Sequence, residues 1–335
     1  MRLTKQFIRK VNLRHIIIYL CLFAPLALFA QGGEYAFNFL RLPYSSHAAA
    51  LGGDNISLID DDITLTAHNP ALLTNVSDKT INITYMSYMR DCNVGGAAFN
   101  KTFGERSSAA VIARYVDYGK FDGYTEDNVF TGTFTAKDID LTFAYSYLLS
   151  ERWSGGASGK IIYSKYESRH ALGLGVDLGI NYFNPESGFS MSFACKNLGG
   201  QVMAFEDKHE IMPMDFQFGI TQRFHHAPIR LSALLNNLHR WERDDFYNAD
   251  GSKDNIGELI LKHFIIGADI LLGNNFHLSL GYNYRASREL SASKNSFDGF
   301  SIGAGLNVYR VKFNASYSKL HTSAHSLLFN LAYPL

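Results

Sequence analysis

The sequence predicts an all-β protein: an antiparallel transmembrane β-barrel of about fourteen strands, preceded by an N-terminal segment that plugs it. From Lys79 onward, apolar and polar residues alternate in segments of about eleven to fifteen residues, whereas strands of soluble proteins usually stop near five or six. The connections between segments are alternately short and long, and aromatic residues gather at one end of the segments. These three features together are typical of outer-membrane barrels.

The chain begins with a predicted export signal at residues 1–30. Basic residues precede an apolar run that ends at Ala30, and we expect cleavage near this small residue. A retained membrane anchor is the weaker interpretation, because Pro25 interrupts a run that is short for a spanning helix. No later segment reaches the roughly 18 uninterrupted apolar residues that a spanning helix needs. We therefore expect an exported protein that crosses the outer membrane with strands.

Each alternating segment predicts one tilted strand, which needs about nine to eleven residues to cross a bilayer. No Pro- or Ser-rich linker divides the exported chain, so we expect an N-terminal plug at 31–78 and one barrel domain at 79–335. The expected strands are 79–90, 93–103, 107–118, 131–148, 152–166, 169–183, 187–198, 213–224, 228–239, 259–272, 275–286, 298–309, 310–320 and 324–334.

Connection length predicts which strand ends face the periplasm. The long connections, at 119–130, 199–212, 240–258 and 287–297, all fall at the same end of the strands, and the connections at the other end are short. Short periplasmic turns and long external loops are typical of outer-membrane barrels, whereas a soluble sandwich has no reason to sort its loops. An aromatic girdle is expected at the periplasmic interface, formed by Tyr147, Trp153, Tyr182, Phe189, Phe224, Phe276 and Tyr333.

The stretch ALGLGVDLGINYF, at 171–183, indicates what each face of a strand contacts. We expect its apolar side to face lipid, because charges on the other sides of the strands are tolerated toward a lumen and costly toward lipid. The inward glycines Gly173, Gly175 and Gly179 leave room for the N-terminal segment to approach. The charged residues expected to face the lumen are Arg114, Asp138, Asp140, Lys160, Asp177, Lys196, Asp215, Arg223, Arg230, Asp269, Arg285 and Lys312.

The N-terminal segment does not alternate, and its motifs resemble those of a known family. The stretch LRLPYSSHAAALGG contains Leu42 and Pro43, and HNPALL contains Asn69 and Pro70; an acidic DDD, then DYGKFDG and KNLGGQ, complete the set. From residue 33 to the C-terminus the chain resembles the PorV/PorQ family of the type IX secretion system, a relative of the FadL-type fatty-acid channels. It is more similar to PorQ than to PorV.

The resemblance implies a fourteen-stranded outer-membrane barrel without chemistry of its own. Such a barrel would anchor a PorZ-like surface accessory protein in the attachment complex that links secreted cargo to lipopolysaccharide. Within the loop 240–258, the rings of Trp241, Phe246 and Tyr247 lie among charged residues, and we expect them to contact that partner. Two alternatives remain: a FadL-like channel for hydrophobic small molecules, and a soluble exported β-protein that binds sugar.

The sequence predicts no enzyme, cofactor or metal site. GFSIG at 299–303 matches the nucleophile-elbow pattern but lies in an alternating strand, and the two Ser-x-x-Lys matches lack their companion motifs. We expect Asp60–Asp62 to cap a helix or pair with an inward arginine rather than bind calcium. Equal numbers of basic and acidic residues, 31 each, give no reason to expect nucleic acid. A Cys92–Cys195 disulfide stays open.

Overall fold

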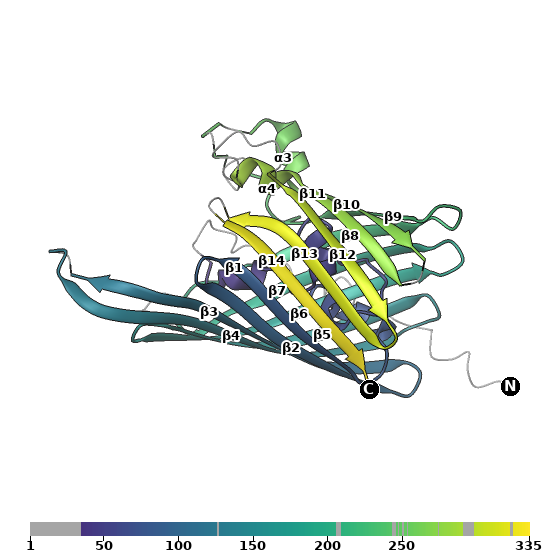
Figure 1. Cartoon of the computed structure of the whole chain (residues 1–335), viewed down its shortest axis with the longest axis horizontal. Helices are drawn as coiled ribbons and strands as arrows, with labels where there is room; N and C mark the ends of the chain where they lie inside the picture. The colour runs from purple at the N-terminus through teal and green to yellow at the C-terminus, as the bar shows by residue number, and fades with distance from the viewer. Residues whose placement is uncertain are drawn as a thin grey trace, which may run out of the picture. The chain divides into compact units, whose positions relative to one another are not determined.

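The computed structural model describes residues 35–335 apart from 126, 206–208, 243–245, 247, 250, 253, 274, 291–297 and 322–323, and residues 35–335 form one compact unit. Within the described residues, fourteen antiparallel strands close into a barrel (Figure 1). The strands are β1 Thr80–Met89, β2 Cys92–Phe103, β3 Ser107–Tyr124, β4 Phe130–Leu148, β5 Trp153–Tyr166, β6 Arg169–Asn184, β7 Phe189–Met203, β8 Asp215–Arg223, β9 Ile229–Leu235, β10 Phe264–Leu272, β11 Phe276–Asn283, β12 Phe300–Val308, β13 Val311–His321 and β14 Ala324–Pro334.

The barrel closes where its first and last strands meet. β1 pairs with β14 over eight residues, from Thr80 opposite Pro334 to Ser87 opposite Leu327. Closure satisfies the backbone N–H and C=O groups of both terminal strands, which is the condition for a sheet to span lipid. The predicted fold class is therefore confirmed.

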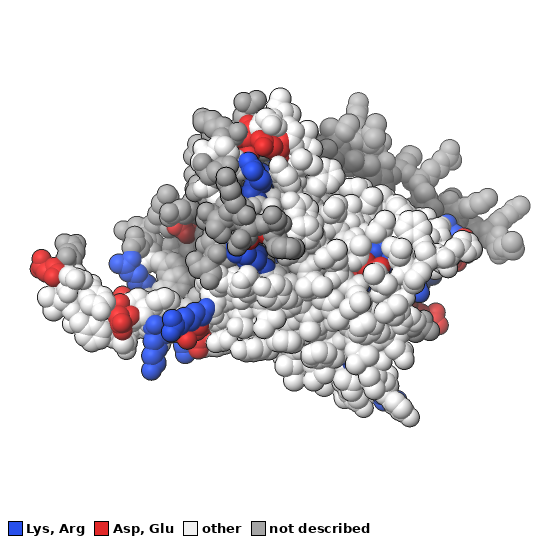
Figure 2. All heavy atoms as spheres, turned by 45° about the horizontal axis from the view of Figure 1, so that its top comes forward, with Lys and Arg blue, Asp and Glu red and all other residues white. Residues whose placement is uncertain are grey.

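The two faces of the strands differ as the alternation predicts. On β6, Leu174, Val176 and Leu178 are exposed on the outer wall, while Ala171 and Asp177 are buried inside. Figure 2 shows the outer wall as a band almost free of charged side chains, with the charges gathered toward its ends. This band is the surface that lipid tails would cover.

The long connections gather at one end of the barrel and the short ones at the other, as the sequence predicts. The long connections, at 204–214, 236–263 and 284–299, all lie at one end of the barrel, which we call the long-loop end. The connections at the opposite, short-turn end are all brief, and residues of the predicted girdle lie there: Tyr147, Trp153, Phe224 and Tyr333 are exposed, and Trp153 packs on Tyr182 with ring centroids 5.1 Å apart.

Two predicted strands are shorter than expected because helices replace their outer ends. α3, Ile256–Lys262, begins with a capping box in which Asn255 and Glu258 each bond to the other's backbone N–H. α4, Tyr284–Leu290, follows β11 directly, and Asn283 accepts a hydrogen bond from the Ala286 N–H. Local capping therefore outweighs alternation at these positions, and Arg285 lies on a helix rather than on a strand. No helix in the described part of the chain has the length and apolar content to span a membrane.

The hairpin of β3 and β4 is longer than predicted. Beyond Asp117, β3 pairs only with β4, and β4 pairs only with β3 before Ala136. The predicted loop 119–130 is therefore mostly paired strand, and it forms a two-stranded ribbon that projects past the other strands (Figure 1). A bulge between Asp117 and Lys120, where Gly119 has a φ of 81°, marks the point where the ribbon leaves the barrel.

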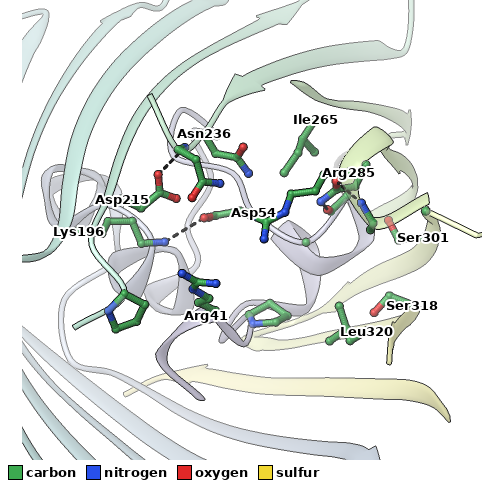
Figure 3. A pocket seen from close by; sticks show the side chains of 18 of the residues that line it. Arg41, Asp54, Lys196, Asp215, Asn236, Ile265, Arg285, Ser301, Ser318 and Leu320 are labelled. Carbon is green, nitrogen blue, oxygen red and sulfur yellow. Dashed lines mark hydrogen bonds and ion pairs between the residues drawn. The ribbon is translucent and has the colours of Figure 1, made fainter. Parts of the chain in front are cut away.

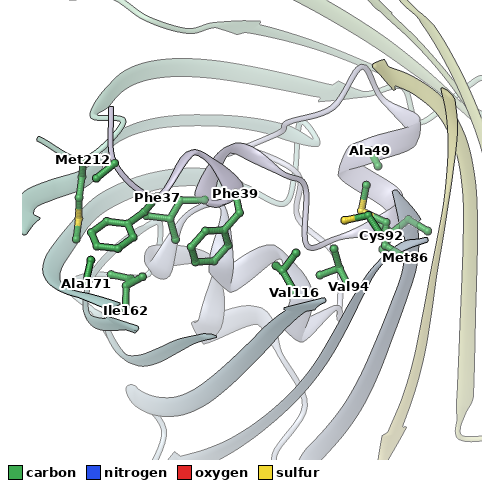
Figure 4. Close-up of a cluster of buried hydrophobic side chains, with 13 residues drawn as sticks. Phe37, Phe39, Ala49, Met86, Cys92, Val94, Val116, Ile162, Ala171 and Met212 are labelled. Atoms are coloured by element: carbon green, nitrogen blue, oxygen red, sulfur yellow. The ribbon is translucent and has the colours of Figure 1, made fainter. Parts of the chain in front are cut away.

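Most of residues 35–76 are buried inside the barrel, where they form a plug of short helices, η2 Asn38–Arg41, α2 Ser46–Ala50, η3 Ile63–Ala67 and η4 Pro70–Asn75. Ser45, Asp62 and Asn69 each cap a helix by accepting a backbone N–H. Figure 4 shows Phe37 and Phe39 of the plug beside Val116 and Ile162 of the wall, in one buried apolar cluster. Cys92 is buried in the same cluster, and both it and Cys195 are free, so no disulfide joins them.

Inward glycines let the plug approach the wall, as expected from β6. A Cβ atom at Gly179 would lie 1.9 Å from Oδ1 of Asn69, and one at Gly173 would lie 2.5 Å from the ring of Phe37. Gly175 instead makes room for Met212, which belongs to the β7–β8 connection. The absence of side chains at these positions is therefore a packing requirement of the plugged barrel.

We expect Gly179→Val to weaken plug docking, because the new side chain overlaps the Asn69 cap. Overpacking of this kind costs roughly 1–3 kcal/mol, and the heat-modifiable migration of the folded barrel in SDS gels would shift to lower temperature. Gly159→Val is the matched control, since a Cβ atom there has no neighbour within 4 Å. Equal shifts in both variants would contradict the packing argument.

Candidate functional site

The long-loop end of the barrel contains a cavity of about 190 Å³ between the plug and the wall. Its floor is plug residues of the η2 region and of the turn that follows α2. Its sides are formed by residues of β7, β8, β10, β11, β12 and β13 and by the segment that follows β9, and α4 contributes Arg285 (Figure 3). Polar and apolar groups both line this space, so it is suited to a polar ligand rather than to a purely hydrocarbon one.

Asp54 connects the cavity floor to the wall. Its carboxylate accepts hydrogen bonds from Lys196 Nζ of β7 at 2.9 Å and from Gln217 Nε2 of β8 at 2.8 Å, and it pairs with His68 of the plug. Although burial raises the pKa of Asp54, Lys196 and His68 lower it below its usual range. Asp54 is therefore a carboxylate at neutral pH, and it fixes the plug to two adjacent strands.

A second charged cluster holds α2 against β9 and β10, which follow β8 in the order of strands around the barrel. His47 lies 3.1 Å from Asp269 of β10 and 3.3 Å from Asp60 of the plug, and its ring stacks on His277 with centroids 4.1 Å apart. Arg230 of β9 donates to Asp269 at 2.7 Å. Asp60 thus pairs inside the bore and Asp62 caps η3, as the sequence predicts for this acidic triplet.

The structure places the sequence-selected inward charges in three different settings. Lys160 and Asp177 form a buried ion pair of 2.8 Å, and Asp138 accepts hydrogen bonds from two tyrosine hydroxyls. Arg114 donates to the carbonyls of Phe39 and Leu42, and so ties η2 to β3. The buried ones are Arg114, Asp138, Asp140, Lys160, Asp177, Lys196, Arg230 and Asp269; Asp215 and Lys312 are partly buried.

Two of the selected charges do not face the bore from a strand. Arg223 is exposed at the last residue of β8, beside a short turn, where water and not the lumen surrounds it. Arg285 lies on α4, as described above, and reaches the cavity from the long-loop end. Both corrections arise because alternation predicts the face of a residue but not where its strand stops.

The motif residues of the plug have structural roles. The Asn69 side chain accepts from the Ala71 N–H and donates to the Ile56 carbonyl at 2.8 Å, and Pro70 begins η4. Leu42 packs against the apolar cluster of Figure 4, and Pro43 lines the cavity. These positions therefore shape the plug and the cavity floor.

The aromatic rings expected to contact a partner differ in their exposure to solvent. Trp241 is about half exposed and stacks on His263 with centroids 4.1 Å apart. Phe246 is buried, because the guanidinium groups of Arg240 and Arg285 lie over its ring at 5.4 and 4.8 Å. Phe246 is therefore no exposed contact residue, and Tyr247 lies outside the described residues.

Sequence reasoning missed two features of the long-loop end. Arg41 lines the cavity directly beside the Leu42–Pro43 motif, but its helix gave no alternation from which to predict a direction. The ribbon of β3 and β4 carries Phe121, Tyr124 and Phe130, and the concentration of aromatic residues between 121 and 134 was the available signal. Glycine, aspartate and threonine between these rings favour a loop assignment and hid the strand.

The His47 cluster makes a pH-dependent contribution to plug docking. Burial lowers the pKa of His47, but the nearby Asp269 and Asp60 carboxylates outweigh it and raise the pKa to about 9. The pKa of His47 in the folded protein is therefore higher than the roughly 6.5 of a histidine in an unfolded chain. The stabilisation of the folded protein by charged His47 is complete below a pH of about 6.5 and is lost as the pH rises through about 9.

We expect the melting temperature of the detergent-solubilised protein to decrease as the pH is raised from about 6.5 to about 9.5. The His47→Gln variant should show a weaker dependence of the melting temperature on pH. His226→Gln is the control, since His226 is exposed in a short turn. The same pH slope in wild type and His47→Gln would refute the assignment.

No protein-family model and no curated protein matches the chain. Among solved structures, the toluene transporter TbuX of Ralstonia pickettii is similar, with a TM-score of 0.54 and 13% identity over 88% of this chain and 98% of that one. The CymD monoaromatic hydrocarbon channel gives 0.54 and 12% over 89% and 98%, and a Pseudomonas aeruginosa FadL homologue gives 0.50 and 11% over 87% and 98%. TbuX is a transporter and CymD is a channel. At such identities the likeness concerns the fold: the chain has the fold of the FadL-like outer-membrane barrels.

Proposed function

We propose that the protein is an outer-membrane barrel that anchors a surface-exposed accessory protein, as a component of a type IX secretion system. The observation that carries this proposal is the projecting ribbon. β3 and β4 contain 18 and 19 residues, whereas a tilted strand crosses a bilayer with about nine to eleven. The seven residues of β3 beyond Asp117 extend the ribbon by roughly 20 Å, at about 3.3 Å per residue.

The ribbon presents aromatic rings in a place where lipid does not cover them. Phe121 stacks on Phe134 with centroids 5.4 Å apart, and Tyr124 meets Phe130 edge to face at 5.7 Å. Tyr124 and Phe130 are 57% and 56% exposed. Aromatic rings exposed among charged residues are frequent anchors of protein interfaces, and Figure 2 shows acidic and basic side chains along the same projection.

The ribbon alone is expected to be only marginally stable. Two strands alone are marginally stable in water, and both edges of this ribbon leave backbone groups unpaired. A partner protein that adds a strand or covers the rings would stabilise it. The resemblance to the PorV/PorQ family suggests the partner: a PorZ-like protein of the attachment complex, held at the surface beside lipopolysaccharide.

The plugged interior supports an anchor rather than a conduit for apolar molecules. Buried ion pairs such as Lys160–Asp177 and Arg230–Asp269 join neighbouring strands on the inner wall. Charged side chains in this position stabilise a fixed plug, but they are a poor surface for a hydrocarbon to pass. The export signal that the sequence predicts at 1–30 is in keeping with an outer-membrane location.

A channel for hydrophobic small molecules is the second candidate, and the structural neighbours favour it. An apolar groove of about 510 Å³ on the outer wall, lined by side chains such as Ile220, Leu231, Ile266 and Leu280, is the feature of this chain that suits it. A hydrocarbon could dock there from the lipid side. The two candidates differ in what the purified protein carries.

We expect the Tyr124→Ser, Phe130→Ser double variant to lose its surface partner in an affinity pull-down from native outer membranes, identified by mass spectrometry. Loss of two ring contacts of about 2 kcal/mol each would remove most of the binding. Tyr309→Ser is the control, because Tyr309 is a fully exposed ring in a short turn at the other end.

Full retention of the partner by the double variant would contradict the proposal. A wild-type barrel that carries a bound apolar ligand and no partner would support the channel instead.

A further inference from the structure

The cavity at the long-loop end has more positive than negative side chains. Arg41, Lys196, Arg285 and Lys319 line it together with two carboxylates, Asp54 and Asp215. Two further carboxylates, Asp298 and Glu289, lie outside the lining and pair with Lys319 and Arg285. The question is whether the protein itself neutralises each of these cations.

Three of the four cations have carboxylate partners. Lys196 bonds to Asp54 at 2.9 Å, Lys319 to Asp298 at 2.6 Å, and Arg285 to Glu289 at 2.7 Å. Within the described part of the chain, Arg41 forms no ion pair; its guanidinium lies over the ring of Tyr35 at 4.9 Å. Figure 3 shows this guanidinium in the space that the other side chains surround.

The surroundings of Arg41 are unfavourable for a cation. Arg41 is still exposed to solvent, but partial burial, and then the guanidinium groups of Arg285 and Arg240, lower its pKa. Arg240 also lies over the Tyr35 ring, at 5.8 Å. Guanidinium groups from η2, from the β9–β10 connection and from α4 therefore converge on one region, where an anion would remove their mutual repulsion.

We propose that this cavity binds a phosphate group, with Arg41 as its principal ligand and Arg285 and Lys196 beside it. The planar fork of a guanidinium matches phosphate oxygens with two parallel hydrogen bonds, and a phosphate would give Arg41 the ion-pair partner that it lacks among the described residues. A volume of about 190 Å³ holds roughly six waters at about 30 Å³ each, which is room for a phosphate and a small substituent. Ser301 and Asn236 also line the cavity and supply polar groups for a substituent.

The position of the cavity restricts the source of the phosphate. The cavity lies at the long-loop end, so its ligand would arrive from the cell surface in the expected orientation. Two sources share this chemistry there: free phosphate, and the phosphorylated saccharide of a surface glycolipid. The inference does not depend on the proposed partner, because the projecting ribbon and the cavity share no residue.

The test is titration of the detergent-solubilised full chain with inorganic phosphate and, separately, with glucose 1-phosphate, by calorimetry at constant ionic strength. We expect wild type to bind and Arg41→Gln to bind at least about tenfold more weakly, because charged hydrogen bonds are lost. Arg106→Gln is the matched control; Arg106 is an exposed arginine at the short-turn end. Arg41→Lys keeps the charge without the fork, and we expect it to fall between wild type and Arg41→Gln.

Heat-modifiable migration in gels verifies that each variant is folded before titration. Tighter binding of glucose 1-phosphate than of phosphate would assign the site to a phosphorylated saccharide, and the reverse order to free phosphate; both support the proposal. Equal affinities of wild type, Arg41→Gln and Arg106→Gln for both probes, or no binding by wild type, would overturn it.

Discussion

Neutralisation of charge inside the bore is the constraint on which the rest of this structure depends. The strands place lysine, arginine and aspartate side chains on the inner wall, where an unpaired charge would be costly. The plug supplies partners for several of them: Asp54 for Lys196, and His47 and Asp60 for the Arg230–Asp269 pair. The barrel interior and the plug are therefore one electrostatic unit.

The same constraint shapes the surface of the barrel. Because inward charges fix the plug, the short helices can approach the wall at glycines such as Gly179 and Gly173. The plug then ends below the long-loop end and leaves a small cavity there. The β3–β4 ribbon projects at the same end, and we assign contacts with other molecules to the ribbon and to this cavity.

Much of the fold was predictable from the sequence, because alternation over long segments has a simple physical cause. Apolar and polar residues must alternate along a strand that lies between lipid and a charged lumen. The number of strands and the gathering of the long loops at one end of the barrel therefore followed from the pattern. Strand ends were less predictable. The Asn255–Glu258 capping box decides where β10 begins, and the turn-forming residues around Tyr124 concealed a paired ribbon.

The sites were less predictable than the fold. Asp60–Asp62 could be assigned to capping and pairing because acidic side chains near an inward arginine have few other uses. The burial of Phe246 depends on Arg240 and Arg285, which reach it from separate connections. The cavity likewise combines Arg41 and Lys196, more than 150 positions apart in the chain. Such convergence has no local signal, so the functional surfaces required the structure.

Electrical conductance across a planar lipid bilayer tests the central claim, that the charged plug stays docked and closes the bore. The purified protein should give no steady conductance, whereas a variant that lacks residues 35–78 should conduct ions at the level of an open fourteen-stranded pore. A steady conductance of the wild type as large as that of the deletion variant would contradict the claim, because the plug would then leave the bore open.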